Sequence, residues 1–320
     1  MKNSGKYACS MSDITINQHY VWQHYLRAWT KRKKLWCKRV DNPEPFNTNP
    51  RNIGAQRFFY EFQQLSNDDI TYLEAVISRA TSPRLRELNQ GWIDSAQMSF
   101  EVRRKLNSID VKPQHREEFE NDLRKVEKTL GESLHGATEE LAIPILAKLR
   151  EEDAAFYQRV ETRNDFINFI SHQYFRTPKM RNIITAIPNP LPHDQARTWP
   201  IEAFIYATNL ASSLVGEGRN RRIVFLRNTS VVPFITGDQP VINLLGVHEE
   251  EVDLYYPLKS SLAIIFTANQ LSFPSDHIDV GGIEVESYNH RIYAMSDSQI
   301  YGDNPAYLKA LAKLPKGKLF

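Results

Sequence analysis

Polar residues near the start of the chain could do chemistry. Asparagine, glutamine and tyrosine supply hydrogen-bond donors and acceptors, histidine titrates near neutral pH, and arginine binds carboxylate or phosphate with two parallel hydrogen bonds. The candidates are Asn17, Gln18, His19, Tyr20 and, two helical turns later, Arg27. We interpret His19 as a candidate general base or acid. In the structural alternative, Asn17 caps a helix and the neighbouring side chains only satisfy buried polar atoms.

Two more candidates lie far along the chain. The segment SHQYFRTPKMR predicts a helix that ends before Pro178, with Arg176 at its C-terminal end. The helix dipole favours an arginine there whether or not it binds a ligand. His172, one turn earlier, could line the same surface, but a lone histidine on a helix is more often structural. Asp238 follows a predicted strand in FITGDQPV. An aspartate at that position can fix a histidine tautomer or bind a cation, although aspartate is also a common turn former.

Several catalytic signatures are missing from the sequence. It contains no Walker loop, GxGxxG, HExxH, GxSxG or EF-hand loop, which excludes the commonest NTPases, zincins and α/β-hydrolases. The two cysteines, Cys9 and Cys37, have no CxxC spacing, so the sequence predicts neither a zinc ribbon nor a disulfide framework.

Charge is distributed unevenly, although the net charge is only +2. Residues 1–60 carry eleven Lys and Arg against three Asp and Glu, whereas residues 231–290 carry one against nine. The polarity indicates either an anionic ligand near the N-terminal part or two parts of one fold that attract each other. A basic run with an aromatic ring could bind phosphates and stack on one base, which makes nucleic-acid-binding candidates of Lys31, Arg32, Lys33, Lys34 and Trp36.

Hydrophobic spacing predicts a largely helical first two thirds. A helix is expected over 17–29, a turn over 31–34 and a strand over 35–40, followed by helices from 65 to 215. The narrow apolar seam that begins at Phe119 predicts a protruding helical hairpin near 92–149. The partner of the seam is either 92–108 or 138–149, where Pro144 would kink a helix.

The spacing changes after Gly216, where short β-branched and aromatic runs predict a small sheet. Helical spacing returns over 285–295 and 305–314. We therefore predict an α+β protein, predominantly helical, with a small mostly antiparallel sheet and a protruding helical hairpin. Its parts would be a basic segment over 1–64, a helical region over 65–215 and a sheet with C-terminal helices over 216–320, together forming one composite domain.

Several motifs, taken in order, carry a resemblance to a known family. NQHYVWQHYLRAW, FFYEF, FRTP, GDQPV, YYPL and a Val-Glu-x-x-Asn helix resemble the uncharacterised bacterial domain-of-unknown-function 4238 family over about residues 15–305. The resemblance implies a shared site without naming a reaction. The implied positions are His19, Tyr20, Arg27, Tyr60, Glu74, Arg176, Asp238, Pro240 and Asn289. The chain departs from the pattern at Trp22, where the family usually has proline, and at His24, where it usually has an aromatic or apolar residue.

Two functions from different classes fit these residues. The first is a nuclease-like hydrolase of a nucleic acid or nucleotide, in the manner of a toxin or phage-defence effector. In it His19 is the acid or base, Asp238 orients it or binds a divalent cation, and other side chains bind substrate. These are Asn17, Gln18, Tyr20, Arg27, Arg176 and Asn289. The second is a non-enzymatic binding or regulatory protein that engages a protein partner through its helical arm, with a structural polar core.

The sequence also bears on location. The N-terminus MKNSGKYACSMSD lacks the apolar stretch of a signal peptide, and no window approaches the ~18 apolar residues of a spanning helix. A cytoplasmic protein without membrane contact is expected.

Overall fold

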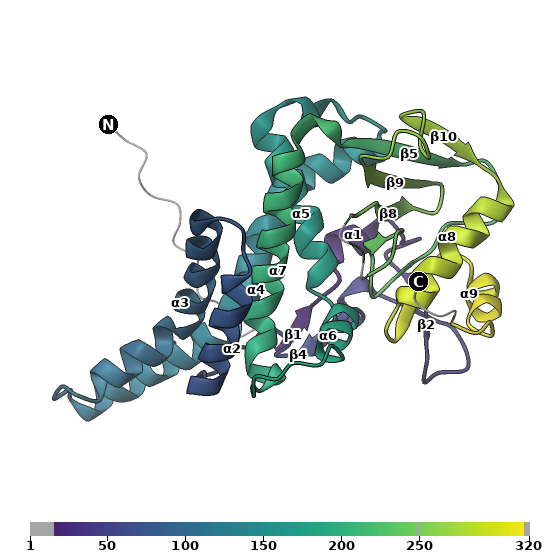
Figure 1. Ribbon diagram of the computed structural model, residues 1–320. Coiled ribbons are helices and arrows are strands. Elements are labelled where there is room, and N and C mark those ends of the chain that lie inside the picture. Colours follow the sequence, from purple (N-terminus) through teal and green to yellow (C-terminus); the bar gives the residue numbers. More distant parts are fainter. Residues whose placement is uncertain (1–15, 248, 250, 317–320) are drawn as a thin grey trace, which may run out of the picture.

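The computed structural model describes residues 16–247, 249 and 251–316. It confirms an α+β fold that is mainly helical (Figure 1). The α-helices are α1 (Gln23–Arg27), α2 (Asn67–Ser78), α3 (Pro83–Leu106), α4 (Pro113–Arg150), α5 (Val160–Phe175), α6 (Pro178–Thr185), α7 (Gln195–Glu217), α8 (Gly282–Met295) and α9 (Pro305–Leu311). Short 3₁₀ helices are η1 (Pro50–Asn52), η2 (Ala155–Gln158) and η3 (Gly218–Asn220).

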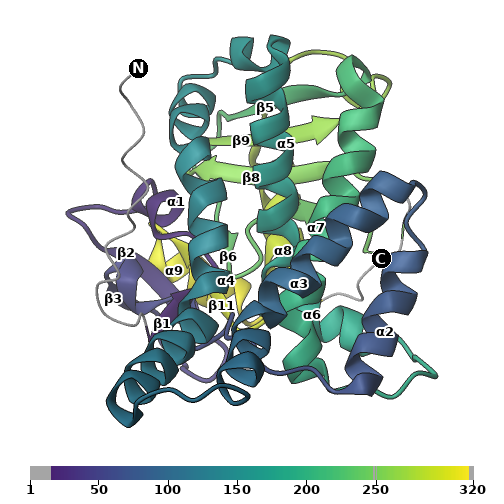
Figure 2. The ribbon, with the colours of Figure 1, turned by 90° about the vertical axis from the view of Figure 1, so that its left-hand side faces the viewer.

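The predicted helical arm is present and consists of α3 and α4, which protrude side by side in Figures 1 and 2. Arg103 joins the two helices, with its guanidinium 2.9 Å from Glu120 and 2.7 Å from Glu127. Of the two expected partners, the stretch 92–108 is confirmed and 138–149 is wrong, because that stretch belongs to α4 itself. The helix continues through Pro144 because neighbours such as Ile145 and Leu146 are fully buried, which offsets the lost hydrogen bond.

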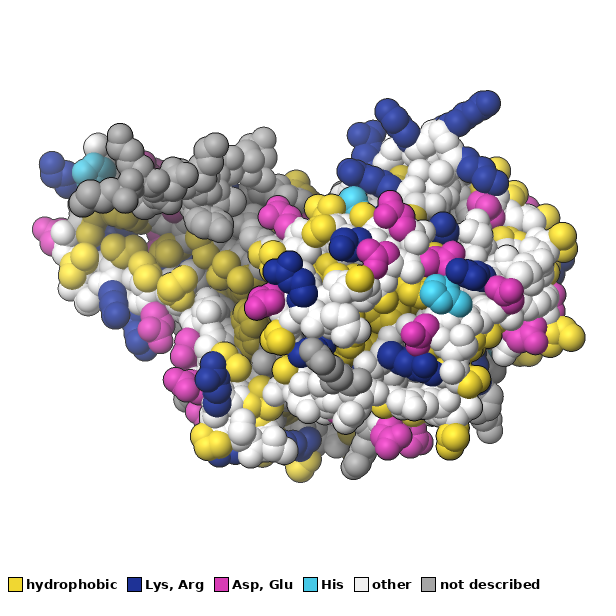
Figure 3. Space-filling model, turned by 90° about the horizontal axis from the view of Figure 1, so that it is seen from above, with side chains coloured by type: hydrophobic (Ala, Val, Ile, Leu, Met, Phe, Trp, Pro, Cys, Tyr) yellow, Lys and Arg dark blue, Asp and Glu magenta, His cyan; other side chains and the backbone are white. Residues whose placement is uncertain are grey.

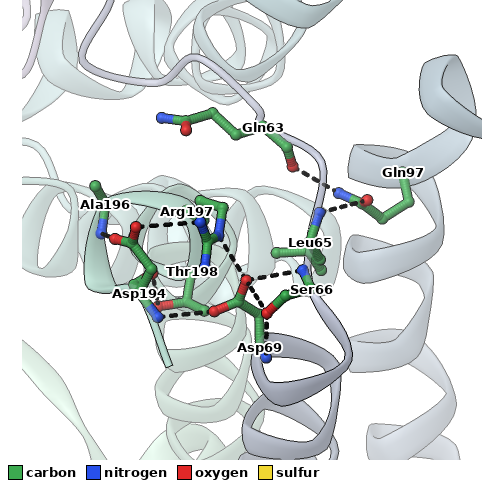
Figure 4. A network of polar contacts seen from close by, with 9 residues as sticks. All are labelled: Gln63, Leu65, Ser66, Asp69, Gln97, Asp194, Ala196, Arg197 and Thr198. Carbon is green, nitrogen blue, oxygen red and sulfur yellow. Dashed lines mark hydrogen bonds and ion pairs between the residues drawn. The ribbon is translucent and has the colours of Figure 1, made fainter. Parts of the chain in front are cut away.

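The start of α2 is fixed by a network around a buried carboxylate (Figure 4). Ser66 and Asp69 form a capping box, in which the Asp69 carboxylate accepts the Ser66 backbone N–H at 2.9 Å. The same carboxylate accepts from Arg197 Nε at 2.6 Å and from the Asp194 backbone at 2.7 Å. The network therefore ties α2 to the start of α7.

A five-stranded sheet occupies the other end of the molecule, in the order β10-β5-β9-β8-β7. Its strands are β5 (Arg222–Asn228), β7 (Ile242–Asn243), β8 (Leu254–Lys259), β9 (Leu262–Thr267) and β10 (His277–Val280). The pairs are antiparallel except β10 with β5. Side chains alternate across the sheet. Tyr256 faces Phe169 of α5, and Tyr255 stacks on Tyr288 of α8 with centroids 4.8 Å apart. Helices thus cover both faces (Figures 1 and 2).

Two smaller sheets bring the N-terminal segment into the fold. A four-stranded sheet has the order β3-β2-β11-β6, with β2 (Leu35–Arg39), β3 (Phe46–Thr48), β6 (Thr236–Gly237) and β11 (Gln299–Gly302). A two-stranded sheet pairs β1 (Asn17–His19) with β4 (Ala55–Arg57). The prediction of one small sheet after 216 therefore captured only part of the β-structure.

The predicted helix over 17–29 begins later than expected. Asn17–His19 form a strand, and α1 starts at Gln23 after the extended Trp22. The backbone of Tyr20 and Val21 donates to Gly54 O at 2.9 and 3.1 Å, which fixes the extended entry. Asn17 is therefore not a helix cap. Trp22 and His24 are the two positions at which the chain departs from the family pattern. Their rings stack on each other with centroids 4.8 Å apart.

Within the described residues, every helix is too short or too polar to cross a membrane.

Candidate functional site

The β1 residues tie three segments together. Gln18 is fully buried; its side chain accepts the Tyr60 backbone N–H at 2.6 Å and donates to the Lys128 carbonyl in α4. Asn17 is exposed and pairs across the sheet with Arg57. Gln18 therefore fixes where β1 meets the arm, and its polar atoms face protein rather than solvent.

Arg176 is the centre of a buried polar cluster and lies, as predicted, at the end of α5. Its guanidinium donates to Tyr60 Oη at 2.9 Å and to the His19 backbone carbonyl at 2.5 Å, and it forms an ion pair with Glu139. Burial works against the charge, but Glu139 and Tyr60 outweigh it, so the pKa of Arg176 is raised. The guanidinium is committed to three protein partners.

The His19 imidazole lies at the rim of this cluster and is about half-buried. Its Nδ1 is 3.2 Å from the Gln23 side-chain amide, which can donate or accept there and so holds either tautomer. Nε2 is buried without a hydrogen-bond partner among the described residues. Burial lowers the pKa of His19, while the backbone of Arg51 acts in the opposite direction. The imidazole is therefore neutral at physiological pH.

Glu132 is a neighbour that the sequence did not single out. Its carboxyl accepts the His19 backbone N–H, and burial raises its pKa. Like His19, the side chain is only partly buried. The contact is made by the His19 backbone and not by its ring, so it brings a carboxyl with a raised pKa to the same residue as a neutral imidazole.

Two histidines are buried behind Arg176. His172 of α5 and His135 of α4 have ring centroids 5.6 Å apart, and His135 stacks on Phe204 at 4.3 Å. Both nitrogens of His135 and Nδ1 of His172 lack hydrogen-bond partners among the described residues. The expectation that His172 lines a surface is wrong, because α4 and α7 cover it and leave it 3% exposed. His135 was missed, although it shares a helix face with Glu139 at four-residue spacing.

Asp238 is fully buried and holds a loop. Its carboxylate accepts from the backbone of Asp297 at 2.7 Å, of Ser298 at 2.7 Å and of Gln299 at 2.8 Å, and from the Ser298 hydroxyl at 3.0 Å. Burial raises the pKa of Asp238 to about 6 against the opposing effect of these hydrogen bonds. Both oxygens are used by residues 297–299, so the expectation that Asp238 orients His19 is not met.

A single side chain links Asp238 to the first motif. The Gln299 amide donates to Tyr20 Oη at 3.3 Å, and its carbonyl accepts from Tyr301 Oη at 3.0 Å. Tyr20 is buried, and burial together with the nearby Asp238 charge raises its pKa. Tyr20 thus belongs to the core rather than to an open substrate site.

The remaining candidate residues lie outside the cluster around Arg176. Asn289 is fully buried. Its side-chain oxygen accepts from Ile235 N at 2.9 Å, and its side-chain nitrogen donates to Pro233 O at 2.8 Å and to Tyr307 Oη at 3.0 Å. Its predicted role in substrate binding is therefore wrong. Pro240 is buried, whereas Arg27 and Glu74 are exposed. Among the described residues, no group of three or more His, Cys, Asp and Glu side chains is placed to hold a metal. The divalent cation stays a prediction.

The basic run forms a rigid, exposed turn at residues 31–34, here named the basic loop. Lys31 and Lys34 exchange backbone hydrogen bonds of 2.8 and 3.1 Å, and Arg32 and Lys33 have φ of 52° and 65°. The Asn49 amide supports the turn from outside by donating to Lys33 O at 3.3 Å. Figure 3 shows Lys and Arg side chains gathered on a projecting segment of the upper face.

The sequence was compared with models of known protein families. The model described as "Protein of unknown function (DUF4238)" matches residues 17–306. The chain belongs to the DUF4238 family. The resemblance predicted over about residues 15–305 is therefore confirmed. Comparison with curated proteins and with solved structures gives no match. In this DUF4238 chain, the motif residues Gln18, Tyr60, Arg176, Asp238 and Asn289 are buried and hydrogen-bonded to protein.

Proposed function

We propose that this DUF4238 protein binds a nucleic acid or a nucleotide through the basic loop, and that its buried polar residues serve the fold. The observation that carries the proposal is the loop itself, in which Lys31, Arg32, Lys33 and Lys34 are all exposed. Clustered cations bind phosphate backbones by releasing condensed counterions.

The loop is preorganised for such binding. The paired hydrogen bonds of Lys31 and Lys34 and the Asn49 contact hold Arg32 and Lys33 in the left-handed backbone conformation of this turn. A rigid binding segment loses little entropy when a ligand binds, which favours affinity. Lys31 also lies 3.4 Å from Asp303, which neutralises part of its charge, so the other three side chains carry most of the expected effect.

Neighbouring cations extend this surface. Arg27 ends α1, which contacts η1, and Arg51 lies in η1. Both side chains are exposed. Trp36 is half-buried at the start of β2 and packs against the core, so its role as a stacking ring stays a prediction.

A second candidate function is hydrolysis, in the nuclease-like sense of a toxin or phage-defence effector. The observation that favours it is the contact of the Glu132 carboxyl with the backbone N–H of His19, a residue whose ring Nε2 has no hydrogen-bond partner among the described residues. In this reaction His19 takes a proton from the attacking water, the water oxygen bonds to phosphorus, and the leaving oxygen departs with a proton from Glu132. A divalent cation brought by the substrate could add charge stabilisation.

Binding is tested by fluorescence anisotropy with labelled single-stranded RNA, single-stranded DNA and a nucleotide. The test variant combines Arg32→Gln, Lys33→Gln and Lys34→Gln. The matched control combines Arg104→Gln, Lys105→Gln and Lys112→Gln, which removes equal charge from exposed positions on the arm. We expect the loop variant to lose at least about tenfold in affinity and the control to stay near wild type. Equal affinities for both variants would contradict the proposal.

Turnover is measured on the same nucleic acids with magnesium or with EDTA. If the second candidate is right, wild type cleaves and both His19→Ala and Glu132→Gln lose activity, while the loop variant raises KM. Binding without turnover in wild type would leave the binding function standing and refute the hydrolase.

The role of the helical arm in binding a protein partner stays a prediction.

A further inference from the structure

A pocket of about 290 Å³ lies where the end of β2 meets the loop that follows α8. The β2 side contributes Lys38 and Arg39, and the C-terminal side contributes Tyr293, the loop 296–299 and Lys316. Its floor is the loop that Asp238 holds. Asp238 itself does not line the pocket, but its hydrogen bonds fix the loop that does.

The floor is rigid. Besides the four hydrogen bonds to Asp238, the Ser296 hydroxyl donates to Ile292 O at 2.8 Å. Gly237 approaches so closely that a Cβ there would lie 2.0 Å from Ser296 Oγ. Close packing of this kind fixes the loop before any ligand arrives.

Three cations line the pocket against one carboxylate. Lys316 uses its ammonium to donate to Ser296 O at 2.6 Å and Asp297 O at 3.1 Å, and Lys38 donates to Arg39 O at 2.5 Å. An ammonium has three N–H donors, so both lysines keep capacity for a ligand. The opposing Asp297 carboxylate accepts from Asn182 at 2.9 Å.

Arg39 is the third cation of the pocket, and one of its nitrogens lacks a hydrogen-bond acceptor in the described part of the chain. Its Nε is buried and has no hydrogen-bond partner among the described residues. The guanidinium lies 5.2 Å from the centroid of the Phe46 ring. A buried donor without an acceptor costs free energy, and because Arg39 lines the pocket, an anion there would bring acceptors to its guanidinium.

We propose that this pocket binds a small organic phosphate of about mononucleotide size. The three cations suit the phosphate, and Tyr293 and Ile300 offer an apolar wall for the rest of the molecule. The site lies at the opposite end of β2 from the basic loop, roughly 13–17 Å away for a five-residue strand. The proposal therefore stands independently of polymer binding at the loop.

Isothermal titration calorimetry of the full chain with AMP, adenosine and inorganic phosphate tests this site. We expect AMP to bind, adenosine not to bind, and phosphate to bind more weakly than AMP. The double variant Lys38→Gln with Lys316→Gln should lose about tenfold or more in AMP affinity, because it removes two charge-assisted donors. The control Lys105→Gln with Lys112→Gln removes two exposed charges from the arm and should bind AMP as wild type does.

Two results would overturn the pocket assignment. One is AMP binding that the Lys38 and Lys316 substitutions leave unchanged, and the other is the failure of wild type to bind AMP at millimolar concentration. Nucleic-acid anisotropy with the Arg32, Lys33 and Lys34 variant separates this outcome from failure of the basic-loop proposal, since the two sets of substitutions remove charge at opposite ends of β2.

Discussion

At the scale of single residues, the chemistry-bearing side chains of this family motif act mainly as structural ties. Arg176 bonds segments that are distant in sequence, namely β1, the Tyr60 region and α4. Buried polar networks of this kind can specify a unique core. The sequence singled out Arg176, Asp238 and Asn289 as site candidates but could not tell whether a ligand or the protein supplies their hydrogen-bond partners, because those partners lie far along the chain.

Replacing Arg176 tests the structural role. Arg176→Met leaves the Glu139 carboxylate buried without its partner, so we expect the free energy of unfolding to fall by about 3–5 kcal/mol in urea denaturation. Adding Glu139→Gln to the same chain should recover part of that loss, because it removes the unpaired charge. A loss below about 1 kcal/mol in the single variant, typical of a surface pair, would refute the assignment.

The buried histidines predict how stability responds to acid. Burial lowers the pKa of His172 to about 3 and holds that of His135 well below 6.5, with the Arg176 charge acting in the same direction. At these two positions the unfolded chain takes up protons below about pH 6.5 and the folded chain does not, so the two histidines lower the stability as the pH decreases through that value, whereas the raised pKa of Asp238 contributes with the opposite sign. We expect a loss of up to about 1.4 kcal/mol per pH unit for each histidine.

His135→Phe isolates one of these groups. Phenylalanine keeps the stacking on Phe204 and sacrifices no hydrogen bond, because both ring nitrogens of His135 are unpartnered among the described residues. Urea denaturation from about pH 7 to about pH 5 should show a shallower loss of stability in this variant than in wild type. An unchanged slope would show that His135 is protonated in the folded protein.

At the scale of elements, long periodic segments were predictable and short strands were not. The seam over 119–134 predicted the arm, and the sheet runs after 216 predicted β5, β8 and β9. Strands of three or four residues, such as β1, β4 and β11, are too short to show a period of two, and their pairing depends on partners far along the chain. That is why the N-terminal segment's place beside β11 could not be foreseen.

Two glycines of α4 test how the arm meets the core. A Cβ on Gly131 would lie 2.5 Å from the Tyr60 carbonyl, so Gly131→Ala should destabilise the protein by about 1–3 kcal/mol. A Cβ on Gly136 would have no neighbour within 4 Å, so Gly136→Ala should stabilise the helix by about 0.5–1 kcal/mol. Thermal or urea unfolding measures both. Equal effects would mean that α4 does not pack tightly on Tyr60.

At the scale of the whole molecule, the uneven charge distribution has two explanations that the structure helps to separate. Among the described residues, the ion pairs of the N-terminal sixty residues run to Asp303 and Lys309, and none runs to the acidic stretch 231–290. Ion pairs between the basic segment and the acidic stretch 231–290 therefore do not explain why the N-terminal segment is so basic. The exposed loop cations stay available for an anionic ligand, which supports the proposed function.

The salt dependence of nucleic-acid binding tests this central claim most directly. For single strands, the slope of log affinity against log salt changes by about 0.7 for each phosphate contact. If the basic loop binds the backbone, the variant lacking Arg32, Lys33 and Lys34 charges should show a slope shallower by up to about 2, while the arm control keeps the wild-type slope. Identical slopes for wild type and the loop variant would contradict the account.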